Sequence, residues 1–208
     1  LSAMMVGRNV NFVVEKKPAK PGEVVLDIKG MSVASKRHKN NAVNNVSLQV
    51  RRGEIVCIAG IDGNGQTEFV YGLSGLEPLK GGTIMMNGKD ITHMLIRSRL
   101  TSGMSHIPED RHKHGLVLDY SLEDNIVLQR YFEPEFTNKF GFLKRKEIRE
   151  YANGLIKQYD IRSSQGAVTT ARSMSGGNQQ KAIVAREIDK ATELLVAVQP
   201  TSGFDVVP

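Results

Sequence analysis

Residues Gly60 to Thr67 combine glycines, polar side chains and a hydroxyl group at a spacing that suits phosphate binding. They follow the apolar run Ile55 to Ala59 and precede a stretch that favours a helix. Glycines let successive backbone N–H groups turn inward around an anion, and the positive end of the next helix adds to the attraction. The spacing therefore predicts a phosphate loop. Its candidate residues are Gly60, Asp62, Gly63, Asn64, Gly65, Gln66, Thr67 and Glu68.

Position 66 departs from the usual form of such a loop, which carries a lysine there. Gln66 can donate a neutral hydrogen bond to a phosphate oxygen but cannot neutralise its charge, whereas the Thr67 hydroxyl can hold Mg²⁺. Phosphate binding should be weakened, and stabilisation of a phosphoryl-transfer transition state should be weakened further. A tight strand-to-helix turn without a ligand remains an alternative for this segment.

A second segment, "SMSGGNQQK" from Ser173 to Lys181, has related chemistry. Ser175, Gly176 and Gly177 stand immediately before a predicted helix, where a hydroxyl and free backbone N–H groups gather at the positive helix end. With Asn178 they form a second candidate anion-binding group.

The two segments together resemble the ATP-binding-cassette (ABC) ATPases. Met174 to Gln180 resembles the signature motif of that family, usually written LSGGQ, and it lies downstream of the phosphate loop as it does there. The resemblance covers Glu23 to the C-terminus. It is closest to the second cassette of tandem-cassette ATPases that serve simple-sugar and nucleoside importers, through the stretches "GIDGNGQTE", "HIPEDRHKHGLV" and "VQPTSGFD".

This resemblance implies a fold and a domain organisation. The fold is expected to be α/β, a P-loop NTPase-like ABC nucleotide-binding domain with a mostly parallel core sheet, an N-terminal antiparallel β part and a helical insertion. Residues 1–22 resemble an interdomain linker that follows an upstream cassette. Residues 23–208 are expected to form the ATP-binding domain, with a helical subdomain at about 120–175. Because the chain begins with Leu1 and stops just after a strand and a turn, we expect a fragment that lacks the C-terminal end of this domain.

The resemblance also implies roles for three further positions. Gln199 stands where the family has its catalytic glutamate, and Val198 stands where it has the preceding aspartate. A glutamine amide can orient water but cannot accept its proton, so hydrolysis by this half alone should be weak or absent. Glu109 occupies the position of the glutamine that senses the γ-phosphate and contacts the membrane subunit, and Asp205 belongs to the D-loop.

Partners and cofactors follow from the same resemblance. Such cassettes pair head to tail, so the signature motif of one completes the ATP site of the other. The chain is therefore expected to be an ATPase subunit that binds ATP and Mg²⁺, partners another cassette and permease subunits, and works indirectly with a substrate-binding lipoprotein. Its expected location is cytoplasmic, peripheral on the inner face of the cell membrane, and its expected cargo is simple sugars or nucleosides. The alternative function is a non-hydrolysing regulatory or structural nucleotide-binding module.

The pattern of apolar residues predicts the strands and helices that must position these residues. Expected strands are Val24–Ile28, Val46–Val50, a buried Ile55–Ala59, Thr83–Met86, Met104–Ile107 and a buried Leu194–Val198, and Gly81–Gly82 is expected to be a turn. Expected helices are Thr67–Leu73, Ser121–Gln129 with a capping box between Ser121 and Asp124, an amphipathic helix around Ile148 to Ile156, and Asn178–Ile188. Buried strands that alternate with helices favour a parallel α/β core.

Composition excludes some other classes of protein. The 208-residue chain has 40% hydrophobic and 24% charged residues, as in ordinary globular domains. Its single cysteine, Cys57, rules out a disulfide within the chain and is expected to be buried. The net charge of +6 admits a nucleic-acid partner, but the basic clusters are short and lack interleaved aromatic residues, so we expect no nucleic-acid binding.

Overall fold

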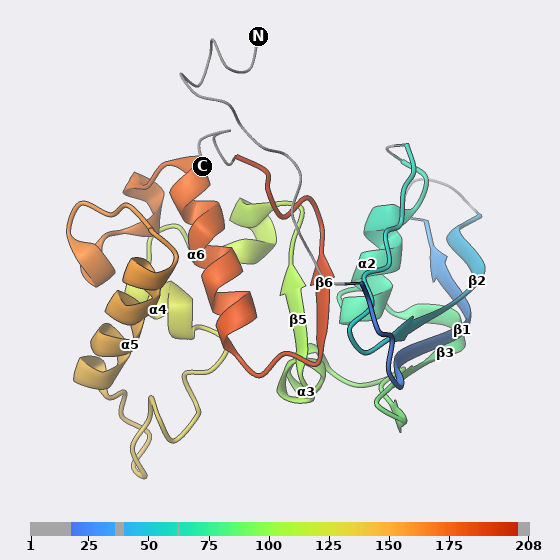
Figure 1. Ribbon diagram of the computed structural model, residues 1–208, viewed down its shortest axis with the longest axis horizontal. Coiled ribbons are helices and arrows are strands. Elements are labelled where there is room, and N and C mark those ends of the chain that lie inside the picture. The colour runs from blue at the N-terminus through green and yellow to red at the C-terminus, as the bar shows by residue number, and fades with distance from the viewer. Residues whose placement is uncertain (1–17, 36–39, 62, 204–208) are drawn as a thin grey trace, which may run out of the picture. The chain divides into compact units, whose positions relative to one another are not determined.

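The computed structural model describes residues 18–35, 40–61 and 63–203 (Figure 1). The chain divides into two compact units, one of residues 15–104 and one built mainly from residues 105–208. The domain boundaries predicted near residues 22, 120 and 175 remain predictions.

The unit of residues 15–104 is built on an antiparallel four-stranded sheet with the strand order β2-β1-β3-β4. Ile28 of β1 pairs with Leu48 on one side and with Ile84 on the other. Four predicted elements are confirmed with wider bounds. The elements are β1 (Val24–Ala34), β2 (Asn41–Arg51), α2 (Gln66–Ser74), β3 (Leu79–Met86), β4 (Lys89–Asp90) and α3 (Ile96–Thr101).

Helix α2 packs closely on this sheet and so fixes the loop that precedes it. Gly72 makes the close approach possible, because a Cβ there would lie 2.5 Å from the Cε of Met31 and 2.8 Å from the Cγ2 of Val33. Met31 and Val33 are fully buried on β1. A side chain at position 72 would push the helix, and with it the predicted phosphate loop, away from the sheet.

The turn predicted at Gly81–Gly82 is wrong, because both glycines lie inside β3. Gly82 has φ +89°, and a Cβ there would lie 2.5 Å from the carbonyl oxygen of Gly30. The pairing of β1 with β3 is irregular at this point, between Lys29 and Ser32. Glycine here therefore marks a bulge with a close backbone approach and not a chain reversal.

The buried strand predicted at Ile55–Ala59 is also wrong. Residues 53–61 carry no strand, and Ile55 is 88% exposed and Ile58 51% exposed. Cys57 is exposed as well, which contradicts its expected burial. The physical reason is the lack of a neighbour: within the described residues no strand pairs with this segment, so it has neither a hydrogen-bond ladder nor a covered face.

The second unit combines a two-stranded sheet with helices (Figure 1). Strands β5 and β6 lie side by side, and α4, α5 and α6 gather beside them. The expected burial of the last strand is wrong in part, since Leu194 is buried but Leu195 is 41% exposed. The elements are β5 (Met104–Ile107), the π-helical turn η1 (Arg111–Gly115), α4 (Leu122–Val127), α5 (Arg145–Gln158), η2 (Gly166–Val168), η3 (Ala171–Ser173), α6 (Gly176–Asp189) and β6 (Leu194–Ala197).

Local signals in this unit behave as predicted. Ser121 caps α4, because its Oγ accepts a hydrogen bond from the Asp124 N–H at 3.1 Å. The apolar stripe of α5 is confirmed, with Ile148, Ala152 and Leu155 buried against α4 and α6. Burial of each large apolar side chain stabilises the fold by about 1.5–3 kcal/mol.

A buried ionic network ties α6 to β5. Glu187 is fully buried, and its carboxylate accepts hydrogen bonds from Arg186 Nε at 3.0 Å, Gln129 Nε2 at 2.9 Å and the His106 N–H at 3.1 Å. Lys190 Nζ adds an ion pair at 2.6 Å. Burial favours the neutral acid, but the charges of Arg186 and Lys190 outweigh burial and hold the pKa of Glu187 below its usual value.

His106 beside this network predicts a loss of stability in acid. Burial lowers its pKa to about 4 from 6.5, against the attraction of Glu187 and with smaller contributions from His114, Lys190 and Arg186. Between these two pH values the unfolded chain binds a proton that the folded chain does not. The free energy of unfolding should therefore fall as pH falls from 6.5 to about 4, by up to about 3 kcal/mol.

Denaturant unfolding of wild type and a His106→Gln variant between pH 7 and pH 4.5 checks this expectation. The variant should show a flatter pH dependence, because residue 106 no longer titrates. Parallel curves for the two proteins would contradict it.

Candidate functional site

The predicted phosphate loop is a tight turn that leads into α2. The Asn64 N–H donates to the Ile61 carbonyl at 3.3 Å, and Gly65 directly precedes the helix with φ +90°. A Cβ at position 65 would lie 2.3 Å from the carbonyl oxygen of Ala42, so only glycine fits. Gly63 also adopts a positive φ, +85°. The loop thus has the backbone freedom that the sequence indicated, whereas Asp62 lies outside the described residues.

The Gln66 side chain folds back into the loop. With its amide oriented to satisfy both partners, its oxygen accepts a hydrogen bond from the Gly60 N–H at 3.1 Å and its nitrogen donates to the Ile61 carbonyl at 3.1 Å. A Cβ at Gly60 would collide with the end of this amide group. Gln66 therefore uses a backbone N–H that a phosphate would otherwise be free to meet. Thr67 and Glu68 follow in the first turn of α2, both partly buried.

The second predicted group lies at the N-terminus of α6. Ser175 is the N-cap residue, and its Oγ accepts from the Asn178 N–H at 3.5 Å and from Asn178 Nδ2 at 2.8 Å. Ser175 is exposed. The helix that follows has 14 residues, so its N-terminus carries the partial positive charge that attracts an anion.

Gly177 is required by a close backbone contact within the unit, and Gly176 leaves room for a neighbouring side chain. A Cβ at Gly176 would lie 2.8 Å from Nη2 of Arg111, and a Cβ at Gly177 would lie 2.6 Å from the carbonyl oxygen of Gly203. No flexible side chain end could relieve the second contact, because it is made with backbone. The lack of side chains at these two glycines therefore lets residues 174–180, the signature motif, pack closely against two segments that are distant in sequence.

One of these neighbours is the turn formed by Gln199 to Gly203, here called the 199–203 turn. The Ser202 N–H donates to the Gln199 carbonyl at 2.9 Å, and Gln199 adopts a positive φ of 44°. Gln180 Nε2 donates to the Pro200 carbonyl at 3.0 Å and so ties the turn to α6. The predicted site residue Gln199 thus lies near the signature motif, whereas Asp205 falls outside the described residues.

The other neighbour is the segment Asp110 to Gly115, here called the 110–115 segment, which follows the exposed Glu109. Asp110 accepts hydrogen bonds from the backbone N–H groups of Lys113 and His112, which lower its pKa. His112 Nε2 lies 3.0 Å from Oε1 of Gln179 on α6. The sequence reasoning missed Arg111 and His112 as neighbours of the signature motif, and no local pattern could have shown contacts across more than 60 residues.

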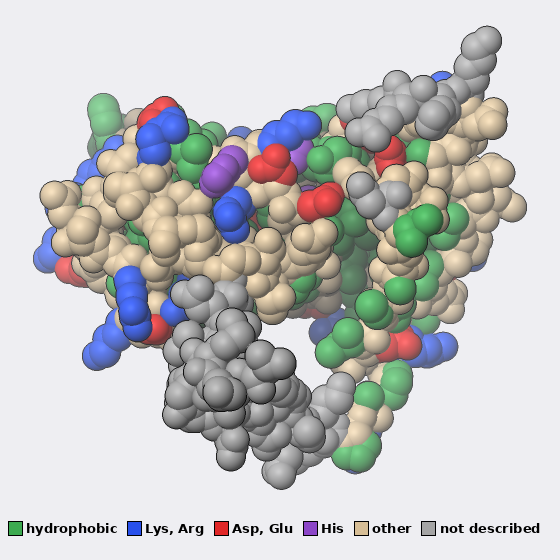
Figure 2. Space-filling view, turned by 90° about the horizontal axis from the view of Figure 1, so that it is seen from above, with side chains coloured by type: hydrophobic (Ala, Val, Ile, Leu, Met, Phe, Trp, Pro, Cys, Tyr) green, Lys and Arg blue, Asp and Glu red, His purple; other side chains and the backbone are tan. Residues whose placement is uncertain are grey.

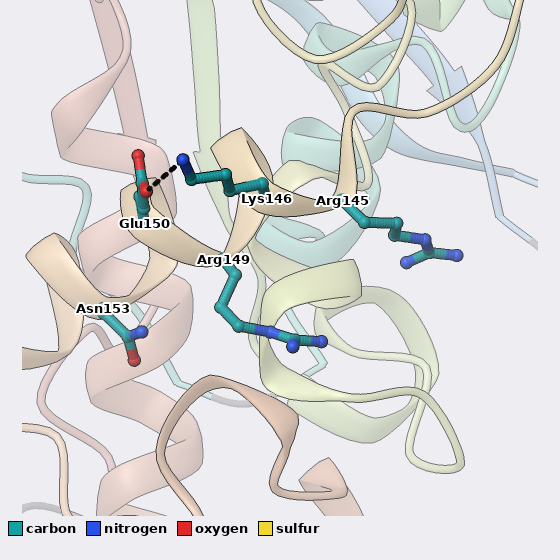
Figure 3. A pocket seen from close by; sticks show the side chains of 5 residues that line it. All are labelled: Arg145, Lys146, Arg149, Glu150 and Asn153. Carbon is teal, nitrogen blue, oxygen red and sulfur yellow. Dashed lines mark ion pairs between the residues drawn. The ribbon is translucent and has the colours of Figure 1, made fainter.

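A surface pocket of about 380 Å³ on α5 offers three cationic side chains but no separate anion site (Figure 3). Arg149 is bound by both oxygens of the buried Glu123, at 2.8 and 3.0 Å. Arg145 pairs with Asp124, and Lys146 lies 3.9 Å from Glu150. Because each cation already has a carboxylate partner, the pocket is electrically compensated.

Surface charge is mixed on the face shown in Figure 2, where blue and red side chains are interspersed. A duplex-binding protein usually gathers its cations on one face or along one helix. The expectation that nucleic acid is not a partner stays a prediction.

No helix among the described residues is long and apolar enough to span a membrane.

Comparison with known proteins identifies the family. The sequence model of the ABC transporter family matches residues 43–202, and this chain belongs to that family. The chain is 48% identical over 206 residues to the "Guanosine import ATP-binding protein NupO" of Bacillus subtilis (strain 168), covering 99% of this chain and 40% of the relative. It is 47% identical over 206 residues to the "Nucleoside import ATP-binding protein NupA" of Lactococcus lactis subsp. cremoris (strain MG1363), with the same coverage.

A ribose-type relative is more distant. The "Ribose import ATP-binding protein RbsA" of Bacillus licheniformis is 36% identical over 204 residues, covering 97% of this chain and 39% of the relative. The chain thus spans about 40% of the length of the curated relatives that it matches.

Solved structures confirm the predicted fold class. The dimeric post-hydrolysis state of the ATP-binding cassette MJ0796 bound to ADP and Pi superimposes with a TM-score of 0.71 at 20% identity, covering 87% of this chain and 76% of that chain. A second dimeric structure of the same bacterial cassette gives a TM-score of 0.69 at 20% identity, covering 86% of this chain and 76% of that one. The chain has the α/β fold of an ABC cassette.

Proposed function

We propose that this chain is the second cassette of an ABC importer ATPase, and that its signature motif completes the nucleotide site of a partner cassette. The observation that carries the proposal is the N-terminus of α6, where the exposed Ser175 and the backbone of Gly176 and Gly177 form the first turn. A hydroxyl and free N–H groups at a positive helix end can stabilise negative charge that develops on a γ-phosphate.

The chain's own nucleotide site is proposed to be degenerate. Gln66 brings no positive charge and binds the loop backbone, and Val198 and Gln199 lack the carboxylates needed to hold metal-bound water and to accept a proton. Mg²⁺ in nucleotide sites is held largely by phosphate oxygens and waters with few protein ligands, and the Thr67 hydroxyl is the candidate protein ligand here. Mg²⁺ would there neutralise phosphate charge. Hydrolysis by this half alone should be weak.

The remaining assignments concern the whole assembly. Its cargo is proposed to be nucleosides or simple sugars, with nucleosides favoured by the names and higher identity of two relatives. Permease subunits, an indirectly coupled substrate-binding lipoprotein and an inner-face membrane location belong to the same proposal, with Glu109 and Asp205 in the roles that the family resemblance gives them. The competing proposal, a nucleotide-binding module that never takes part in hydrolysis, is favoured only by the degenerate loop.

A Ser175→Arg substitution tests the signature-motif proposal. In an ATPase assembled from this chain and a complementary cassette, the long cation should fill the space for the γ-phosphate and abolish turnover, which is measured as phosphate release. Ser98→Arg places the same side chain at an exposed position of α3, in the other unit, and should leave turnover unchanged. Retained turnover in Ser175→Arg would refute the proposal, and so would an equal loss in both variants.

A further inference from the structure

Arg111 makes contacts that link three separate parts of the second unit. Its Nη1 donates to the Ser202 carbonyl at 3.3 Å. A Cβ at Gly176 would lie 2.8 Å from Nη2, and a Cβ at Gly203 would lie 2.9 Å from Nη1. The guanidinium therefore fills the space that both glycines leave open, between the signature motif and the 199–203 turn.

A contribution to fold stability does not explain the position of Arg111. A cation near a helix N-terminus is repelled by the partial positive charge there. Its Nε atom is buried and has no hydrogen-bond partner among the residues that the structure describes. A buried unpaired donor and a poorly placed charge are features that commonly mark a functional position.

The 110–115 segment holds Arg111 firmly in this place. Besides Arg111, His112 bonds Gln179 at 3.0 Å, and Gly115 packs against Ile183, where a Cβ would lie 2.6 Å from Cδ1. Asp110 fixes the start of the turn through two backbone N–H groups. The segment is thus fastened to α6 over two helical turns.

We propose that Arg111 is a positioning residue for the signature motif. Its planar guanidinium keeps the first turn of α6 in register with the 199–203 turn, so that Ser175 and the Gly177 N–H present a fixed geometry to a nucleotide held by a partner cassette. This inference rests on the proposed function of the signature motif. Arg111 acts through that motif and touches no reacting atom.

The test measures ATP turnover in the ATPase assembled from this chain and a complementary cassette. Arg111→Ala should lower kcat by roughly tenfold to a hundredfold, because small misplacements of stabilising groups have effects of that size. KM for ATP should change by less than about threefold, since the partner's own loop holds the nucleotide. Arg111→Lys keeps the charge but loses the fork and should remain impaired, which covers the case in which the alanine variant does not fold. Arg172→Ala is the matched control, because Arg172 is exposed and, among the residues that the structure describes, its guanidinium pairs with the exposed Asp119 alone.

A double variant separates positioning from general loosening of the fold. Gly176→Ala should lower kcat by itself, since its Cβ would meet the guanidinium, but should cause little further loss in an Arg111→Ala background. Independent, multiplying losses would overturn the inference, as would kcat within twofold of wild type in Arg111→Ala or an equal loss in Arg172→Ala. If Ser175→Arg abolishes turnover while Arg111→Ala does not, the inference fails and the proposed function stands. If Ser175→Arg leaves turnover intact, both fail.

Discussion

Replacing Gln66 with lysine should tighten ATP binding by this chain by about tenfold to a hundredfold. The lysine adds a charge-assisted hydrogen bond to a phosphate, worth about 1.5–3 kcal/mol. It also removes the amide that engages the Gly60 N–H and the Ile61 carbonyl, each at 3.1 Å. Both changes act in the same direction. Calorimetric titration of ATP, with and without Mg²⁺, measures the effect after a cooperative thermal melt has been established for each protein.

Two control variants separate charge from release of the loop. Gln66→Met removes both hydrogen bonds without adding charge, so any gain in affinity reports release of the backbone alone. Gln165→Lys adds the same charge at an exposed position far along the chain and should leave affinity unchanged. An unaltered or weakened affinity in Gln66→Lys would show that the side chain does not limit nucleotide binding.

Removing the carboxylate of Glu187 should destabilise the second unit by about 3–5 kcal/mol. The alanine variant leaves the charges of Arg186 and Lys190 buried without their shared partner, since these side chains are only 3% and 11% exposed. Gln129 Nε2 and the His106 N–H lose an acceptor at the same time. Equilibrium unfolding in urea at pH 7 measures the loss as a change in the free energy of unfolding.

The size of this effect depends on burial, and a paired control shows it. Glu150→Ala breaks an exposed ion pair with Lys146 that is 3.9 Å long. The free energy of unfolding of this variant should therefore hardly differ from that of wild type. Glu187→Gln keeps the size of the side chain and part of its hydrogen bonding. Its loss in the free energy of unfolding should therefore lie between those of the two alanine variants. A loss in Glu187→Ala as small as that in Glu150→Ala would contradict the role assigned to the network.

Much of the fold could be predicted because its signals are local. The capping box at Ser121, the apolar stripe of α5 and the glycine-flanked α2 each depend on residues within about two helical turns of one another. The two candidate anion-binding segments were visible for the same reason, since each is a short run that leads directly into a helix. Where a prediction failed, as at Ile55–Ala59, burial depended on a partner strand that no local pattern could supply.

The sequence by itself determined the family, the type of most of the longer elements and the two glycine-rich helix starts, because residue type and spacing set backbone freedom and capping. Only the tertiary structure decided how those residues are used. In the tertiary structure the Gln66 side chain folds back and hydrogen-bonds the backbone of its own loop. Arg111 lies between Gly176 and Gly203. The tertiary structure also gathers His106, Gln129 and Lys190 around Glu187. The physical reason is that a side chain's role depends on the charges, donors and packing around it, and in the second unit most of these come from residues far along the chain.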